Sequence, residues 1–340
     1  MKVLSVVGNR PQFIKSGPLS VALRDGGIDE VVVHTGQHWD PEMSAVFFEE
    51  LGLPEPRYRL DLRTSEPATM EPAIRAAVER ERPDWVLVYG DTNSTLAGAV
   101  AADGVPVAHV EAGLRSFDLS MPEERNRIAV DRIAALLLCP DERSAAQLAE
   151  EGVAGRREVV GDVMADAARV FLPIARRRAR VPAEDGYAVL TLHREANTDP
   201  PSLRRIVAAL NGVPWQFVFP VHPRTRRVLD EHGIELGANI HVLEPLGYLE
   251  MLALVDGAAR VVTDSGGLQK EAYWLRVPCV TLRANTEWVD TVRAGANTLV
   301  DPAQPERIEE ALEAAAFPVD APPLYGDGHA SERIAALLAS

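Results

Sequence analysis

Short apolar segments rich in Val, Leu and Ile alternate with longer helix-like stretches along the whole chain. In the first half these segments predict β-strands at 3–7, 31–34, 85–89, 106–110 and 135–139, with a weaker run at 57–62. In the second half they predict strands at 187–192, 216–219, 240–243, 260–263, 278–282 and 298–300. Near-continuous apolar strands separated by helices indicate parallel sheets that are covered on both faces.

A basic, proline-containing stretch at 173–186 separates the two sets of strands. We therefore expect an α/β fold with two Rossmann-like, doubly wound parallel sheets of about six strands each, whose binding edges face a common cleft. The expected domains are 1–168 and 169–327, and the helix-like end at 328–340 is expected to pack back on the first domain.

Composition narrows the class of protein. The 340 residues are 46% hydrophobic and 25% charged, which is typical of a globular protein and excludes disordered, collagen-like and membrane classes. The net charge of −15 argues against nucleic-acid binding and means that an anionic substrate must be captured by a local group of cations. Cys139 and Cys279 lie in apolar runs and are expected to be buried, reduced thiols.

The sequence shows neither a signal peptide nor a membrane-spanning segment. The apolar start of the chain is too short for a signal peptide, and no apolar run approaches the length of about 18 residues that a membrane helix needs. We therefore expect a cytoplasmic protein that has no membrane partner.

Four polar or glycine-containing turns mark where a ligand would bind. In a doubly wound sheet, ligands lie at the carboxyl ends of the first and fourth strands. In the first half these ends are 8–12 and 90–95, and in the second half they are 193–195 and 264–267.

The sequence DSGGLQKEA at 264–272 follows one of these strands and opens a predicted helix. Its glycines permit close backbone approach, and a helix N-terminus favours an anion, so Ser265, Gly266 and Gly267 predict a diphosphate site with Glu271 placed to bind a ribose. The alternative is a plain helix cap. The chain carries neither a Walker loop nor a GxGxxG turn after its first strand, which disfavours ATP hydrolysis and a nicotinamide cofactor.

Basic residues and histidines supply further candidates for phosphate binding. Arg10 and Lys15 lie in GNRPQFIK, where they could bind phosphate or be ordinary surface cations. His193 and His222 each follow an apolar strand and are candidates for a general acid or a phosphate donor, against a purely structural role. The histidines lack the paired spacing of metal ligands, so no metal is expected.

Three carboxylates are candidates for acid–base chemistry. Asp91 and Glu111 end strands predicted to be adjacent, and Glu123 opens a helix after a loop that could fold back over that edge. Asp91 could instead cap a helix, and Glu123 could simply interact with a helix dipole. Glu111 has no such structural explanation, and its only evident cationic neighbour in the sequence is Arg115, which is expected to bind the substrate.

These residues lie in motifs that closely resemble the non-hydrolysing UDP-N-acetylglucosamine 2-epimerase family. The resemblance runs from about Val3 to Val300. It includes GNRPQFIK, HTGQH, VLVYGDTNSTLAG, VAHVEAGLRS, MPEERNR, VVGDVMAD, LTLHRE, FPVHPRT, EPLGYLEM, TDSGGLQKEA and LRANTEW.

The resemblance implies a glycosyltransferase-B type of fold, a homodimer, and interconversion of UDP-N-acetylglucosamine and UDP-N-acetylmannosamine without a metal or nicotinamide cofactor. It implies elimination of UDP to a 2-acetamidoglucal, followed by re-addition of UDP. Asp91, Glu111 and Glu123 match the family's catalytic carboxylates. The positions matched around the nucleotide are Arg10, Lys15, His193, Ser265, Gly266, Gly267, Glu271 and Arg283.

Departures from the family pattern keep alternatives open. Gln37 and His38 fit the motif of members that are activated by a second UDP-sugar, but Asp40 stands where glutamine is typical, which argues against such activation. The sequence motifs GDTNST and TEWVD also resemble those of relatives acting on UDP-2,3-diacetamido-2,3-dideoxyglucuronic acid. A hydrolysing epimerase, a sugar transferase and an inactive UDP-sugar-binding protein are further alternatives.

Overall fold

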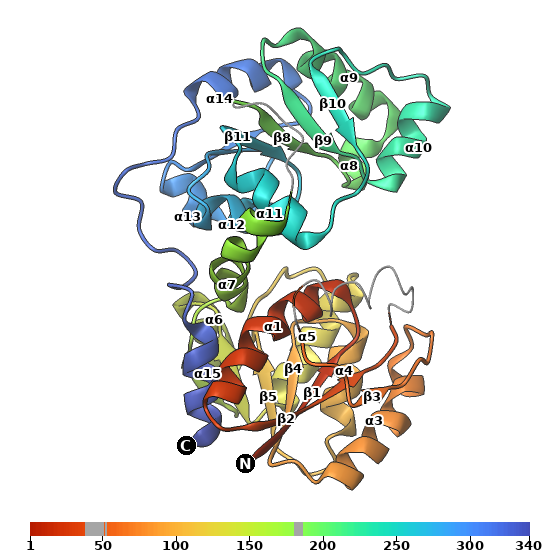
Figure 1. Cartoon of the computed structure of the whole chain (residues 1–340), viewed down its shortest axis with the longest axis vertical. Helices are drawn as coiled ribbons and strands as arrows, with labels where there is room; N and C mark the ends of the chain where they lie inside the picture. Colours follow the sequence, from red (N-terminus) through yellow and green to blue (C-terminus); the bar gives the residue numbers. More distant parts are fainter. Residues whose placement is uncertain (38–50, 52, 180–185) are drawn as a thin grey trace. The chain divides into compact units, whose positions relative to one another are not determined.

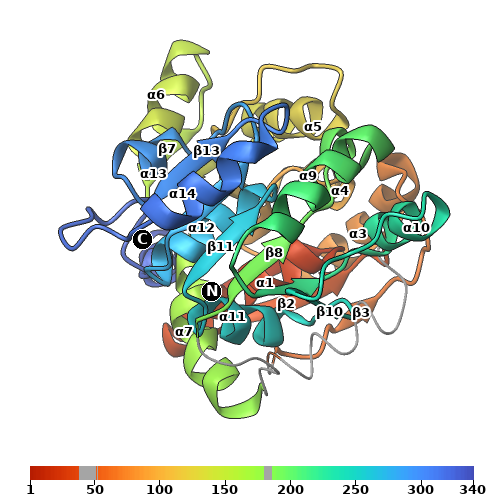
Figure 2. The ribbon, with the colours of Figure 1, turned by 90° about the horizontal axis from the view of Figure 1, so that it is seen from above.

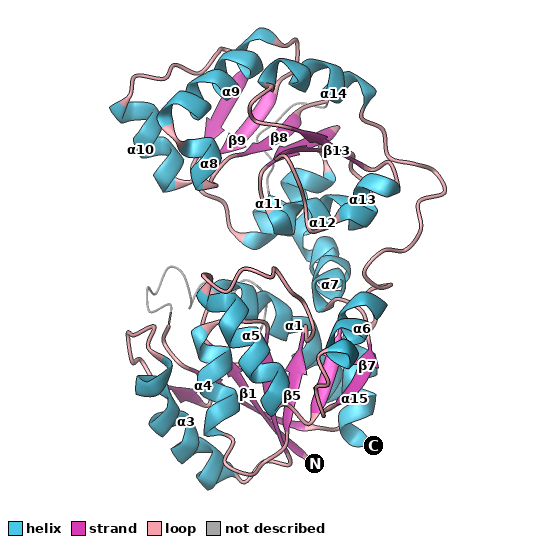
Figure 3. Cartoon of the chain, turned by 180° about the vertical axis from the view of Figure 1, so that it is seen from behind, coloured by secondary structure: helices cyan, strands magenta, loops and turns pink. Residues whose placement is uncertain are grey.

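The computed structural model describes residues 1–37, 51, 53–179 and 186–340. The chain divides into two compact units, which are Met1–Val170 with Tyr325–Ser340, and Phe171–Leu324. Each unit contains one parallel β-sheet with helices on both faces, as Figures 1 and 3 show. The prediction of two doubly wound α/β sheets is therefore confirmed.

The sheet of the first unit has seven strands in the order β3-β2-β1-β4-β5-β6-β7. The strands are β1 (Lys2–Val7), β2 (Asp29–His34), β3 (Tyr58–Arg59), β4 (Trp85–Tyr89), β5 (Val107–Val110), β6 (Leu136–Cys139) and β7 (Arg156–Val159). The sequence did not predict β7, because Arg156 and Glu158 make this edge strand polar and largely exposed. The central order 3-2-1-4 places the ends of β1 and β4 side by side, as predicted.

Helices cover both faces of this sheet. They are α1 (Arg10–Asp25), α3 (Pro67–Glu81), α4 (Asn93–Ala101), α5 (Pro122–Ile133), α6 (Glu142–Glu150), the first part of α7 (Val163–Arg178) and α15 (Ala330–Ala339). Helices α3, α4 and α5 pack in succession on one face, while α1 and α15 pack together on the other (Figures 1 and 3). Apolar side chains of the strands, such as Val86 and Val88, join Met70 and Ile74 of α3 in a continuous core.

The sheet of the second unit has six strands in the order β10-β9-β8-β11-β12-β13. The strands are β8 (Ala188–Thr191), β9 (Phe217–Pro220), β10 (Ile240–Leu243), β11 (Arg260–Thr263), β12 (Cys279–Leu282) and β13 (Asn297–Val300). All six coincide with predicted segments. Figure 2 shows β8 and β11, the two central strands, which end where the sequence predicted a binding edge.

Two apolar clusters, one including residues of α9 and α14 and the other residues of α11 and α12, stabilise this second sheet. The helices are α8 (Glu195–Thr198), α9 (Pro200–Gly212), α10 (Pro223–Glu231), α11 (Tyr248–Asp256), α12 (Gly266–Trp274), α13 (Val289–Arg293) and α14 (Ile308–Ala314), with a 3-10 turn at Pro305–Arg307.

Cys139 and Cys279 are free and buried, and burial raises the pKa of each thiol to about 12. Of the helices the structure describes, none is long and apolar enough to cross a membrane.

A buried carboxylate fixes the returning C-terminal helix to the first unit. Asp166 of α7 is fully buried and accepts backbone N–H bonds from Ala330 at 3.1 Å and Ser331 at 2.6 Å, which are the first residues of α15. These N–H groups would otherwise have no intrahelical acceptor. Asp166 therefore caps α15 from a distant part of the sequence.

We predict that Asp166→Ala weakens the attachment of α15, because two buried N–H groups lose their acceptor at a cost of about 1–3 kcal/mol each. Hydrogen exchange of the Ala330–Ala339 amides should accelerate. Glu332→Gln is the matched control, since it weakens only exposed contacts to Arg169 and His329, each worth about 0–1 kcal/mol. Equal exchange in the two variants would contradict the capping role.

Candidate active site

The loop after β1 is shaped by a close approach between backbone and side chains. A Cβ on Gly8 would lie 2.0 Å from Oγ of Ser94, so only glycine fits there. Asn9 then caps α1 by accepting the N–H of Gln12, and the Gln12 side chain donates to the carbonyl of Tyr89 at 3.0 Å. These contacts fix the start of α1, which carries Arg10 and Lys15, beside the carboxyl end of β4.

Lys15 and Glu111 form an ion pair at this edge of the sheet. Nζ of Lys15 contacts Oε2 of Glu111, and each side chain is only 13% exposed. Gly90, which follows β4, lies against both groups, because a Cβ there would be 3.3 Å from each of these two atoms. The backbone of Glu111 has φ +70°, a left-handed conformation that is strained for a residue with a side chain and is frequent at functional sites.

The charge on Lys15 is stabilised by its neighbours. Burial disfavours the charged amine, but the nearby carboxylates of Glu111, Asp91 and Asp162 outweigh this effect and raise the pKa of Lys15 above its ordinary value. Three carboxylates from different elements therefore share one buried cation.

The cation that pairs with Glu111 is Lys15 and not Arg115, its nearest cationic neighbour in the sequence. The guanidinium of Arg115 is held at 2.7 Å by both Asp131 and Glu151, and its side chain is 2% exposed. Lys15 reaches Glu111 from α1, which starts beside the end of β4, although the two residues are 96 positions apart in the sequence.

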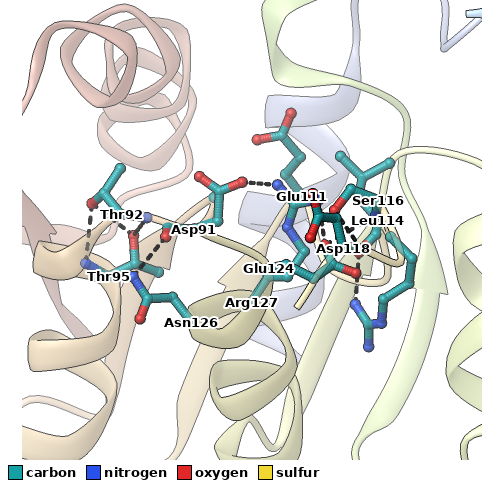
Figure 4. A network of polar contacts seen from close by, with 12 residues as sticks. Asp91, Thr92, Thr95, Glu111, Leu114, Ser116, Asp118, Glu124, Asn126 and Arg127 are labelled. Atoms are coloured by element: carbon teal, nitrogen blue, oxygen red, sulfur yellow. Dashed lines mark hydrogen bonds and ion pairs between the residues drawn. The ribbon is translucent and has the colours of Figure 1, made fainter. Parts of the chain in front are cut away.

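Asp91 lies beside this pair and bonds a second cation. Its carboxylate forms an ion pair with Arg127 of α5 (Figure 4). It does not cap α4, the structural alternative for this residue, because Thr92 is the cap and accepts the N–H of Thr95. Asp91 is thus available to chemistry at the same edge, and Arg127 is a neighbour that the sequence did not single out.

The two glutamates that open α5 differ in their surroundings. Glu123 is exposed on the first turn of the helix. Glu124 is buried and accepts the N–H groups of Ser116 and Phe117, both at 3.0 Å, which ties the loop after Glu111 to α5 (Figure 4). The structure therefore brings Lys15, Glu111 and Asp91 together and leaves Glu123 at the solvent-facing start of the helix.

In the second unit, a buried aspartate organises the turn after β8. Asp264 accepts backbone N–H bonds from His193 and Arg194 and a side-chain bond from Asn197, and Nδ1 of His193 lies 3.0 Å from its Oδ1. Burial opposes the charge, but His193 and these N–H donors hold the pKa of Asp264 below its ordinary value. The His193 ring is thereby oriented while 40% of the side chain stays exposed.

His222 lies near His193 and has a structural contact of its own. It caps α10, because its Nδ1 accepts the N–H of Arg224 at 3.2 Å, and its ring centroid is 6.1 Å from that of His193. Burial and the positive neighbours His193 and Arg224 lower the pKa of His222. A neutral His222 with Nδ1 as acceptor keeps Nε2–H as a donor.

The turn at DSGG opens α12 as the sequence predicted. Ser265 is the N-cap, with its Oγ 3.4 Å from the N–H of Leu268. A Cβ on Gly267 would meet nothing within 4 Å, and one on Gly266 would make only ordinary contacts. The N–H of Ser265 donates to Oγ1 of Thr263 at 2.9 Å, so the backbone donors at this helix start that can face an anion are those of Gly266 and Gly267. Glu271 lies one turn further along α12.

A glutamate between two arginines lies next to this helix start. NH1 of Arg283 bonds Oε2 of Glu287 at 2.6 Å, and NH2 of Arg194 is 3.5 Å from Oε1 of the same carboxylate. Burial opposes the charge of Glu287, but the two arginines lower its pKa. Two cations are thus gathered beside Gly266.

Two further expectations concern regulation and metals. Oε1 of Gln37 accepts bonds from the backbone and hydroxyl of Ser94, at 3.1 and 2.7 Å, whereas His38 and Asp40 lie outside the described residues. Within the described ranges, no group of three or more His, Cys, Asp and Glu side chains is arranged to hold a metal ion.

The fold and these two charged edges define a class, the two-sheet α/β proteins of the glycosyltransferase-B type. The glycosyltransferase VinC shares this fold with a TM-score of 0.54 over 100% of this chain and 96% of its own, at 19% identity.

The chain belongs to the UDP-N-acetylglucosamine 2-epimerase family, whose model matches residues 22–339. It is 46% identical to the UDP-2,3-diacetamido-2,3-dideoxy-D-glucuronate 2-epimerase of Pseudomonas aeruginosa, over 100% of this chain and 99% of that protein. The crystal structure of Methanocaldococcus jannaschii UDP-GlcNAc 2-epimerase in complex with UDP-GlcNAc and UDP is 39% identical. It matches with a TM-score of 0.85 over 100% and 99% of the two chains. The family resemblance drawn from the motifs is confirmed.

We predict that Lys15 and Glu111 are energetically coupled. In a double-mutant cycle with Lys15→Met and Glu111→Gln, the coupling in the free energy of unfolding should be about 0.5–3 kcal/mol, because each charge is poorly solvated without the other. Lys2 and Glu81, an ion pair of the same unit with a more exposed lysine, give the control cycle, with a coupling of about 0–1 kcal/mol. Additivity within about 0.3 kcal/mol at Lys15 and Glu111 would contradict the coupling.

Proposed function

We propose that this enzyme inverts C2 of a UDP-linked 2-acetamido sugar by eliminating UDP and adding it back. The observation that carries the proposal is the strained Glu111, which is paired with Lys15 beside Asp91 at the carboxyl edge of the first sheet. A proton on C2 is only weakly acidic, so its removal requires a positioned base, and re-protonation from the other side requires an acid.

The second unit is assigned to the nucleotide. The N–H groups of Gly266 and Gly267, the hydroxyl of Ser265 and the dipole of α12 favour the diphosphate, while the N–H of Ser265 donates to Oγ1 of Thr263 at 2.9 Å. Arg283 is held ready beside them by Glu287, and Glu271 is assigned to the ribose. His193, oriented by Asp264, is assigned as the donor to the departing diphosphate, with His222 behind it.

The first unit is assigned to the proton transfers. A carboxylate takes the C2 proton, the electrons of that bond form a C1–C2 double bond, and the C1–O bond breaks with its electron pair leaving on UDP. A proton is then delivered to the opposite face of C2, and the UDP oxygen re-forms the bond to C1. Asp91, Glu111 and Glu123 are assigned to these steps, and Arg10 and Lys15 offset the developing negative charge.

Two substrates fit this assignment. The first is UDP-N-acetylglucosamine, which would be converted to UDP-N-acetylmannosamine, and the bound ligands of the M. jannaschii enzyme support it. The second is UDP-2,3-diacetamido-2,3-dideoxy-D-glucuronate, which is supported by the 46% identity to the P. aeruginosa enzyme over nearly the whole of both chains. Both carry an acetamido group at C2 and would use the same proton transfers.

Incubation of each UDP-sugar with the enzyme in D2O, followed by proton NMR, tests this proposal. We expect the C2 epimer of one of them to appear with deuterium at C2, because the removed proton exchanges with solvent before it is replaced. A C2 epimer that retains protium would contradict the elimination route. Net release of free sugar would instead indicate a hydrolysing enzyme, and binding without turnover an inactive UDP-sugar-binding protein.

We predict that Glu111→Gln lowers kcat at least about 100-fold, which is the lower range for general acid–base catalysis. The amide keeps the shape of the side chain but can neither accept nor deliver the proton. UDP affinity, measured by calorimetry, should change little because the diphosphate is assigned to the second unit. Glu81→Gln is a control that removes a carboxylate of the same unit from Lys2, outside the proposed site. Near-normal turnover of the folded Glu111→Gln variant would reject the assignment.

A further inference from the structure

A fully buried histidine lies behind the two turns that carry Asp91 and Glu111. His109 belongs to β5, and its side chain has no exposed surface. Its Nε2 lies 2.7 Å from the carbonyl oxygen of Gly90, and its Nδ1 lies 2.8 Å from Oδ1 of Asp131. The ring therefore bridges the end of β4 and helix α5.

Asp131 carries the connection on to the turn after β5. Its Oδ2 accepts a bond from NH1 of Arg115 at 2.7 Å and from the backbone N–H of Gly113 at 3.3 Å. Gly113 has φ +85°, and a Cβ there would lie 2.4 Å from the carbonyl oxygen of Ser144, so this turn has little freedom of its own. One chain of bonds thus runs from Gly90, next to Asp91, to Gly113, two residues after Glu111.

The partners of the ring decide where its protons lie. The carbonyl of Gly90 can only accept a hydrogen bond, so Nε2 must carry a proton. Burial opposes the charge of Asp131, but His109 and Arg115 outweigh it and lower the pKa of Asp131. The buried guanidinium of Arg115, which bonds Oδ2 of Asp131 at 2.7 Å, favours the ionised carboxylate. An ionised carboxylate only accepts hydrogen bonds, so Nδ1 carries a proton as well.

We propose that His109 is a positioning residue held as a buried imidazolium, whose two N–H bonds fix the turns bearing Asp91 and Glu111 relative to each other. It touches no reacting group and acts through the backbone of those turns. The negative charge of Asp131 compensates its charge, and Arg115 and Glu151 complete a network of two cations and two anions. The role as a positioning residue rests on the proposed function, whereas the two protons on the ring do not.

The ring protons can be observed directly in the wild-type protein. With 15N-labelled histidine, the His109 signals at pH 7.5 should show both ring nitrogens bonded to hydrogen, and the signals that disappear in His109→Asn identify them among the eight histidines. An unprotonated Nδ1 or Nε2 would overturn the proposal.

Two variants separate positioning from stability. The amide nitrogen of asparagine can take the place of Nδ1, and that of glutamine can take the place of Nε2. His109→Asn therefore frees the turn of Asp91, and His109→Gln breaks the connection to Asp131. We expect each to lower kcat by about 10- to 100-fold, as a displacement of about 1 Å would, with UDP affinity unchanged. Asp166→Asn, a buried carboxylate variant outside the site, is the control and should keep kcat.

Each outcome counts for or against the proposal. Normal kcat in folded His109→Asn and His109→Gln would show that the ring is structural only and would overturn the role in positioning. If the variants do not fold, the ring signals of the wild type decide. If the wild type epimerises neither UDP-sugar, the proposed function fails. The proposal for His109 is then tested by its ring signals and by a crystal structure of His109→Asn. Protons on both ring nitrogens and a displaced Gly90–Asp91 turn would support it, and an unmoved turn would contradict it.

Discussion

The carboxyl ends of parallel strands meet at one edge of a sheet, and in the first unit this brings several carboxylates into a partly buried place where their charges must be compensated. Neighbouring strands are only about 4.8 Å apart, so the carboxylates of Asp91 after β4 and Glu111 after β5 come close enough to repel each other. Lys15 resolves the repulsion by pairing with Glu111, and Arg127 pairs with Asp91. Gly90 leaves room for the Lys15–Glu111 pair, because a Cβ there would lie 3.3 Å from each of the two charged groups.

Carboxylates are compensated by cations in two successive layers of the first unit. At the edge, Lys15 and Arg127 compensate Glu111 and Asp91, the carboxylates that we propose for the proton transfers. Behind it, His109 and Arg115 compensate Asp131 and Glu151, to which no proton transfer is assigned. In this proposal the inner layer fixes the turns and the outer layer carries the proton transfers. A base in such a site is pre-organised, because its charge and its backbone are fixed before a substrate arrives.

Hydrophobic periodicity was enough to predict most of the fold. All the strands with apolar cores were found, and the order 3-2-1-4 followed from the doubly wound pattern. Strand β7 could not be found in this way, because Arg156–Val159 pairs through its backbone alone at the edge of the sheet. The capping role of Asp166 was equally invisible, since its partners lie more than 160 residues away.

The candidate site was predictable in part. The residue types that end the strands pointed to Asp91, Glu111 and DSGG, and the structure places each at the expected edge. Their partners could not be predicted, because Lys15 and Arg127 reach Glu111 and Asp91 across the fold rather than along the chain. The left-handed backbone of Glu111 leaves no mark in the sequence, where a glycine would have signalled it.

A crystal structure of the Glu111→Gln variant with bound UDP-sugar would test the central claim most directly, because it locates C2 relative to the charged edge of the first sheet. We expect C2 to lie about 3–3.5 Å from a side-chain oxygen of residue 111 or of Asp91, the separation expected of reacting atoms. A sugar ring bound with C2 turned away from both side chains, beyond the reach of either, would contradict it.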